Sequence, residues 1–155
     1  MKLHDITYAE IFSQVPRLCV DLLITNGKKQ ILLGERLHEP FFNQWAMPGG
    51  RVFFGETIEA AISRILTNEL NFLESVDKQK LIGYVDFVNE VPIANRHSVS
   101  MVFQIDCSDI TAFSSTESFS RIAFFNYEEL KNVIVMNNHA SFIDNYFNFV
   151  NTIYG

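Results

Sequence analysis

The chain has 155 residues, enough for one domain with a hydrophobic core (residues 1–155) but not for two. Hydrophobic residues make up 48% of it, which excludes a disordered protein. The net charge of −6 argues against a broad nucleic-acid surface, although a local cluster of arginines can still bind phosphate. No apolar run resembles a signal peptide or approaches the length of a membrane span, so we expect a cytoplasmic protein.

Hydrophobic periodicity and turn residues predict alternating strands and helices. In chain order these are a helix at 6–14, strands at 18–25 and 30–34, a strand–turn–strand segment at 45–51, a helix at 57–72, strands at 80–90, 97–106 and 121–125, and helices at 128–133 and 140–153. The segments 89–95 and 111–119 have the composition of loops. This pattern is typical of a single α/β domain.

Two polar or aromatic residues in the first strand and helix are candidates for a site. Asp21 interrupts an otherwise apolar strand, and a carboxylate there needs a partner. That partner is either structural, Arg36 or a helix end, or Asp21 faces an active site. Tyr8 lies in the N-terminal helix, where the local sequence predicts packing, and the family resemblance given below also implies a role in stacking on a substrate base.

The stretch from Trp45 to Phe72 organises the chain. Pro48-Gly49-Gly50 predicts a tight turn, because glycine adopts backbone angles that other residues avoid. Gly55-Glu56-Thr57 predicts a helix start with Thr57 as the N-cap. Glu69 falls within the apolar stripe of this helix, so either a cation binds it or it turns outward at the helix end.

Basic residues flank this stretch. Arg51 can bind a phosphate in a bidentate manner, and Arg36 follows the strand at 30–34. Arg64 either contacts a phosphate or holds the glycine loop through a salt bridge. His97 begins the strand at 97–106, where it is either a surface residue or a substrate contact. On that strand Ser98, Ser100, Val102 and Gln104 share one face, and Val99, Met101, Phe103 and Ile105 share the other.

These residues resemble the signature of Nudix hydrolases. The matches at the required spacings are Gly50, Glu56, Arg64, Glu69 and Phe72. The departures are Ile65 and Asn68, where the family usually has glutamates, and Asn71, where it has glycine. The reduced signature and the segments ending at Asp21, Arg36 and Val52 resemble the GDP-mannose mannosyl hydrolase branch.

The resemblance implies a Nudix fold, an α/β/α sandwich with a mixed central sheet. It also implies Mg²⁺ (Mn²⁺ is possible), held by Glu69 and the carbonyl of Gly49, and a nucleotide-sugar substrate. In that branch water attacks the anomeric carbon and GDP leaves, and Arg36 and Arg51 would stabilise the leaving group. Arg64 is a further catalytic candidate by its place in the signature. The branch also suggests a homodimer, with which fifteen phenylalanines are compatible.

The general base is where the chain departs most from that branch. The branch has a glutamine and a histidine in the loop before the last strand, where this chain has Ser118 and Phe119. Glu117 is therefore our candidate for the base or an additional metal ligand. Three functions are open: a GDP-sugar hydrolase acting at carbon, a Nudix enzyme acting on another nucleoside diphosphate derivative, and a nucleotide-sugar binder with little turnover. We expect Asp21, Arg36, Arg51, Arg64 and Glu117 to be catalytic, and Tyr8, Arg36, Arg51 and His97 to bind substrate.

Overall fold

The computed structural model describes residues 5–27, 29–74, 76, 78–88, 97–107 and 109–154. Its elements are α1 (Asp5–Phe12), β1 (Arg17–Asn26), β2 (Gln30–Arg36), β3 (Trp45–Ala46), β4 (Gly49–Arg51), α2 (Ile58–Leu70), β5 (Gln79–Val88), β6 (His97–Asp106), the 3₁₀ helix η1 (Ile110–Ala112), β7 (Phe119–Phe125), α3 (Tyr127–Leu130) and α4 (Asn137–Tyr154). The predicted helices and strands are confirmed in type and order. The predicted loop at 89–95 lies outside the described residues.

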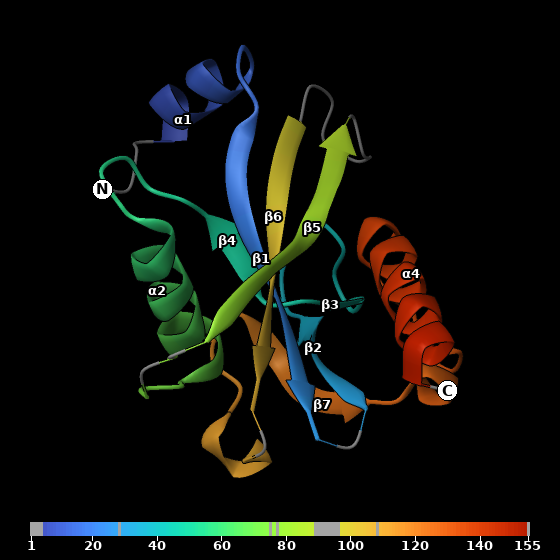
Figure 1. The fold of residues 1–155 in the computed structure, drawn as a ribbon. Coiled ribbons are helices and arrows are strands. Elements are labelled where there is room, and N and C mark those ends of the chain that lie inside the picture. Colours follow the sequence, from blue (N-terminus) through green and yellow to red (C-terminus); the bar gives the residue numbers. More distant parts are fainter. Residues whose placement is uncertain are drawn as a thin grey trace.

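The strands form one mixed sheet between two long helices. Its main path is β3-β2-β1-β6-β5, and β4 pairs with β1 while β7 pairs with β2. The β1–β6 pair is parallel, and the other strand pairs are antiparallel. Figure 1 shows α2 on one side of this sheet and α4 on the other. The predicted sandwich with a mixed central sheet is confirmed.

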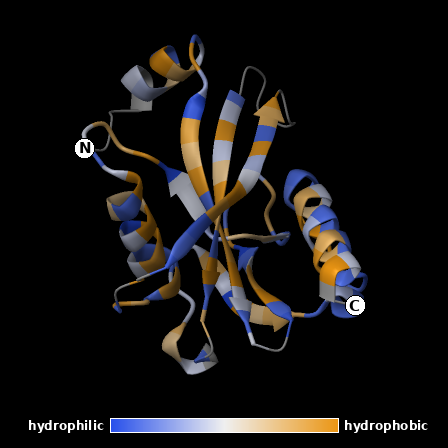
Figure 2. Cartoon of the chain, viewed as in Figure 1, coloured by the Kyte–Doolittle hydropathy of each residue, from blue (hydrophilic) through white to orange (hydrophobic). Residues whose placement is uncertain are grey.

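Strand alternation divides the core into two clusters, one on each face of the sheet. On β1, Val20, Leu22 and Ile24 pack in the cluster that contains the apolar side of α2. Leu23 points to the opposite face and packs with Ile143 of α4. Figure 2 shows hydrophobic residues along the central strands, with polar positions alternating on the helices. Each fully buried aliphatic side chain stabilises the fold by roughly 1.5–3 kcal/mol.

The sheet face toward α4 changes character along β1. Leu23 is apolar and fully buried, whereas the residues two and six positions earlier on this face, Asp21 and Arg17, have charged or polar side chains. The neighbouring strand β6 repeats the change, because Val102 belongs to the core cluster while Ser100 lines a pocket. The polar half of this face therefore forms the floor of the pocket described below.

Among the residues that the structure describes, none of the helices combines the length and the apolar character needed to cross a membrane.

Candidate active site

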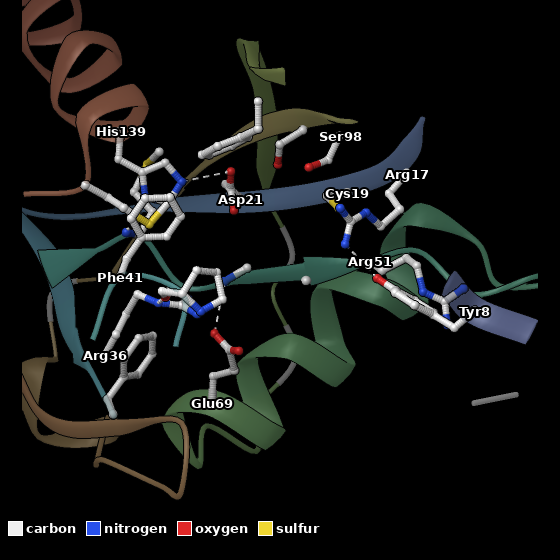
Figure 3. Close-up of a pocket in the computed structure, with 18 residues that line it drawn as sticks. Tyr8, Arg17, Cys19, Asp21, Arg36, Phe41, Arg51, Glu69, Ser98 and His139 are labelled. Atoms are coloured by element: carbon white, nitrogen blue, oxygen red, sulfur yellow. Dashed lines mark hydrogen bonds and ion pairs between the residues drawn. The ribbon is translucent and has the colours of Figure 1, made fainter. Parts of the chain in front are cut away.

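The pocket lies over the polar half of the sheet and collects side chains from several elements. The charged or titratable side chains that line it include Arg17, Asp21, Arg36, Arg51, Glu69 and His139. Figure 3 shows Arg36, Phe41 and His139 toward one end, and Arg17, Arg51 and Tyr8 toward the other. Five of the predicted site residues (Asp21, Arg36, Gly49, Arg51 and Glu69) are brought together here, with Tyr8 at the rim.

Glu69 turns into the pocket from the last turn of α2. Its Oε2 accepts a hydrogen bond of 3.0 Å from the backbone N–H of Gly49. Burial raises the pKa of the Glu69 carboxyl to about 7, although the Gly49 N–H and the nearby Arg36 oppose this shift. Glu69 makes no ion pair within the described part of the chain. Of the two interpretations of Glu69, the outward-turned side chain is therefore wrong.

Asp21 is held by His139, a residue that the sequence analysis missed. The Nε2 atom of His139 lies 3.1 Å from Oδ2 of Asp21, and both side chains are buried. The backbone N–H of Met47 donates to Nδ1 of the same ring at 3.0 Å. In the neutral ring Nδ1 is thus the acceptor, so Nε2 carries the hydrogen that is donated to Asp21. The alternative partner Arg36 does not fill this role.

Gly49 lies between the carboxylates of Asp21 and Glu69. The physical reason why this position needs glycine differs from the predicted one. Gly49 and Gly50 belong to strand β4, and neither has a positive φ, so the predicted tight turn is wrong. A Cβ at Gly49 would instead overlap the Asp21 carboxylate and lie 2.7 Å from the carbonyl oxygen of Val20. Glycine is required here because the chain passes so close to Asp21. Within the stretch from Trp45 to Phe72, the glycine with left-handed geometry is Gly55, at φ 79° before α2.

Arg36 and Arg51 extend into the pocket without carboxylate partners among the described residues. The Nε of Arg36 donates to the carbonyl of Pro40 at 2.9 Å, which leaves its terminal nitrogens for a ligand. Burial lowers the pKa of Arg36, but a guanidinium stays charged near neutral pH. The guanidinium carbon of Arg51 lies 4.9 Å from the centre of the Phe53 ring and 5.3 Å from the centre of the Tyr8 ring. The Tyr8 ring therefore orients an arginine.

Arg64 points away from the pocket and holds the loop before α2. Its Nε lies 2.7 Å from Oε1 of Glu56, and one terminal nitrogen donates to the carbonyl of Arg51. Glu56 also accepts a hydrogen bond from the N–H of Phe53. The structure therefore shows the loop-holding salt bridge, and the predicted catalytic position of Arg64 is corrected. Thr57 caps α2 as predicted, through the N–H of Ala60.

Two predicted site residues, Glu117 and His97, do not line the pocket, whereas Phe119 does. Glu117 is exposed and does not line the pocket, and its carbonyl oxygen contacts the ring of His38 instead. His97 begins β6 but also lies outside the pocket lining. Phe119 does line the pocket, and its ring packs directly over Gly34. The carboxylates that reach the pocket are therefore Asp21 and Glu69.

Comparison with known proteins assigns the family. The model of the NUDIX domain family matches residues 15–146, which is most of the chain. The chain belongs to the Nudix family. This confirms the prediction of a Nudix hydrolase, but it does not distinguish the GDP-mannose branch. The homodimer and the cytoplasmic location also stay predictions.

Relatives of this Nudix domain carry different names. It is 28% identical over 110 residues to the low-salt glycan biosynthesis protein Agl8 of Haloferax volcanii, covering 70% of each chain. It is 35% identical over 91 residues to the ADP-ribose pyrophosphatase of Methanocaldococcus jannaschii, covering 59% of this chain and about half (51%) of that protein. The fold resembles the Nudix domain of Shewanella oneidensis NrtR, solved with ADP-ribose, with a TM-score of 0.70, 19% identity, and 96% and 99% of the two chains covered.

Nudix hydrolases typically use a divalent metal, and the donor set here is unusually small. The described residues contain no group of three or more His, Cys, Asp and Glu placed to hold an ion. At the positions of the family glutamates, Ile65 is buried in the core and Asn68 is exposed. Asn71 takes the left-handed C-cap conformation (φ 52°), which explains how asparagine replaces the family glycine.

The remaining donors still fit one kind of metal site. Glu69 is a partly buried carboxylate that forms no ion pair in the described part of the chain, and a cation bound beside it would offset its charge. Mg²⁺ often binds through one or two carboxylates and completes its shell with waters and substrate phosphates. The residues therefore fit a cation shared with a phosphate ligand, and they do not fit a cage built from protein side chains alone.

Proposed function

We propose that this Nudix domain hydrolyses a nucleotide sugar, with GDP-mannose or a similar GDP-sugar as the first candidate. The observation that carries the proposal is the pair Arg36 and Arg51. Both enter one pocket, and neither forms an ion pair with a carboxylate in the described part of the chain, although Glu69 and Asp21 lie near enough to favour the charged form of Arg36. Guanidinium groups that keep free N–H donors suit the oxygens of a diphosphate.

The proposed reaction forms a bond between the water oxygen and the anomeric carbon of the sugar. The bond between that carbon and the diphosphate oxygen breaks, and the nucleoside diphosphate leaves with the electron pair. Arg36 and Arg51 stabilise the charge that develops on the departing diphosphate. Asp21 accepts the proton of the attacking water, and His139 fixes its carboxylate for that task.

A divalent cation would be held by Glu69, with the carbonyl of Gly49 as a proposed second ligand, and it would neutralise charge on the diphosphate. Attack at carbon places less demand on the metal than attack at phosphorus, because the cation need not activate the nucleophile. The loss of two carboxylates at Ile65 and Asn68 therefore supports the carbon reaction.

A second candidate is a pyrophosphohydrolase that cleaves another nucleoside diphosphate derivative at phosphorus. The similarity to a relative named ADP-ribose pyrophosphatase favours it. The same arginines would bind the diphosphate, but the water oxygen would end in a phosphate product.

The test incubates the protein and Mg²⁺ with GDP-mannose, and separately with ADP-ribose, in ¹⁸O-labelled water. Label in free mannose, with unlabelled GDP, supports attack at carbon, whereas label in a phosphate product supports the second candidate.

Arg36→Gln should lower kcat/KM by roughly 100-fold or more, since it removes a donor to the developing charge. Arg121→Gln is the matched control, because Arg121 is an exposed arginine paired with Glu35 outside the pocket. Absence of turnover with measurable binding would overturn both candidates in favour of a binding protein.

A further inference from the structure

We propose that the end of the pocket formed by Arg17, Tyr8, Ser98 and Ser100 is a second anion-binding subsite. It would take a carboxylate or a phosphate that the substrate carries in addition to its diphosphate. The shared chemistry is a group with several negatively charged oxygens. The anion-binding subsite itself does not depend on the proposed function. Only the inference that the anionic group belongs to a nucleotide derivative rests on it.

Arg17 has an incompletely satisfied guanidinium. The residue is only 9% exposed, and its buried Nε has no hydrogen-bond acceptor. One terminal nitrogen donates to the Tyr8 hydroxyl at 2.9 Å, and the guanidinium also lies 5.7 Å from the centre of that ring. No carboxylate in the described ranges forms an ion pair with Arg17. A buried arginine normally has its charge and its donors matched, so these features indicate a missing acceptor.

Ser100 provides a second, independent sign of a missing ligand. It is 1% exposed, and its Oγ has no hydrogen-bond partner. In the parallel pairing of β1 with β6, Arg17 stands opposite Ser98 and Cys19 opposite Ser100. Ser98 and Ser100 therefore lie on the same face as Arg17, and all of them line the pocket. Figure 3 shows Ser98 beside Arg17 at this end.

The charges at this end favour an anion over a neutral or cationic group. Arg51 lies close by, since its guanidinium is 5.3 Å from the centre of the same Tyr8 ring. The Tyr8 hydroxyl accepts from Arg17, so its own hydrogen remains available to a ligand. The pocket acids are engaged elsewhere, Asp21 with His139 and Glu69 with Gly49.

The subsite begins beside Arg51, which we assign to the diphosphate, and lies on the side of Arg51 away from Asp21. Arg17 and Asp21 lie on one face of β1 and four positions apart, which corresponds to about 13 Å along a strand. A sugar, ribose or short linker can cover that distance. The substrate class that fits is a nucleoside diphosphate derivative with an additional acidic group, either a sugar acid or a phosphorylated ribose.

The first test needs no turnover. Inorganic phosphate, and in a separate titration acetate, is added to ¹⁵N-labelled protein while the Arg17 Nε–H and the Ser100 amide are followed by NMR. We expect both signals to shift with one common Kd in the wild type, and Arg17→Gln, followed through the Ser100 amide, to weaken that Kd by about tenfold. Ser100→Ala, which keeps the packing and removes only the hydroxyl, should weaken it less. Arg121→Gln should leave it unchanged.

The two titrations distinguish the sources of the anion. Saturation by phosphate alone assigns a phosphate, and saturation by acetate alone assigns a carboxylate. Signals near Arg17 that do not shift with either anion, or a Kd that Arg17→Gln leaves unchanged, would overturn the subsite. These readouts are independent of hydrolysis, so failure of the proposed function and failure of the subsite can be told apart.

The second test compares matched substrates that differ in one acidic group. GDP-mannuronate is compared with GDP-mannose, and ADP-ribose 2′-phosphate with ADP-ribose, by kcat/KM and by Kd. One acidic member should be preferred, and Arg17→Gln should lower kcat/KM and raise Kd more for that acidic member than for its neutral partner, so that the preference is lost. A wild-type protein without preference in either pair would overturn the inferred substrate class.

Discussion

The carboxylate of Asp21 and the imidazole of His139 form a buried pair, with 3.1 Å between Oδ2 and Nε2. The pair joins β1 to the first turn of α4 across 118 positions of sequence. Both ring nitrogens are engaged, because the Met47 N–H occupies Nδ1. His139 therefore fixes the position of Asp21, and it is not itself free to take a proton from substrate.

His139→Ala should destabilise the fold and reduce activity together. It removes the buried donor to Asp21 and leaves the Met47 N–H without an acceptor, which costs about 1–3 kcal/mol of unfolding free energy. His139→Gln can restore a donor to Asp21 and should recover part of the loss. Urea unfolding and kcat/KM measure the two effects. Equal losses in both variants would contradict a role in orienting Asp21.

Gly49→Ala should be strongly damaging although alanine adds only one methyl group. The new Cβ would overlap the Asp21 carboxylate and press on the Val20 carbonyl, and such overpacking costs about 1–3 kcal/mol. The fall in kcat/KM should be larger than the loss of folded protein can explain, because the displaced Asp21 carboxylate lines the pocket. Gly27→Ala is the matched control, since a Cβ there meets nothing within 4 Å. Thermal unfolding and kcat/KM of the two variants give the comparison.

Local pattern predicted most of the fold, because its elements carry strong local signals. The strand at 97–106 and the Thr57 cap lie where periodicity and capping chemistry place them. Helix α4 begins at Asn137, three residues before the predicted start. Its first turn contains His139, whose partners are Asp21 and Met47. The first turn of α4 therefore contacts the sheet through a polar side chain. The apolar stripe by which the helix was predicted begins only after this turn, so the prediction started the helix too late.

The candidate site was predictable where chemistry follows the Nudix signature, and not where it depends on tertiary packing. Gly49, Arg51 and Glu69 fall within one short stretch, so their spacing placed them together. Nothing in the sequence near His139 indicates that it meets Asp21. The serines of β6 were correctly placed on one face, but the strand pattern alone does not show that this part of the face lines a pocket.

Glu69→Gln tests the metal proposal with a nearly isosteric change. The amide oxygen can still accept from the Gly49 N–H, but the negative charge that would attract a cation is lost. Mg²⁺ should raise the melting temperature of the wild type and not that of the variant, because a ligand stabilises only a protein that binds it. Activity should fall by roughly 10- to 100-fold. Glu59→Gln, at an exposed position in the first turn of α2, is the control. Mg²⁺-dependent activity that survives in Glu69→Gln would refute the metal assignment.

The Glu56–Arg64 pair should give the protein a stability that is lost in acid. The hydrogen bond from Arg64 is the main cause that lowers the pKa of Glu56 from its ordinary value near 4.5 to about 2. The unfolded chain therefore binds a proton at higher pH than the folded chain does, so the contribution is fully present above pH 4.5 and declines as pH falls toward 2. Glu56→Gln should be less stable than wild type at pH 7, and the difference should shrink over this range. Urea unfolding at several pH values measures it, with Glu59→Gln as the control. A difference that stays constant from pH 5 to 2 would show that the Glu56 charge does not stabilise the loop.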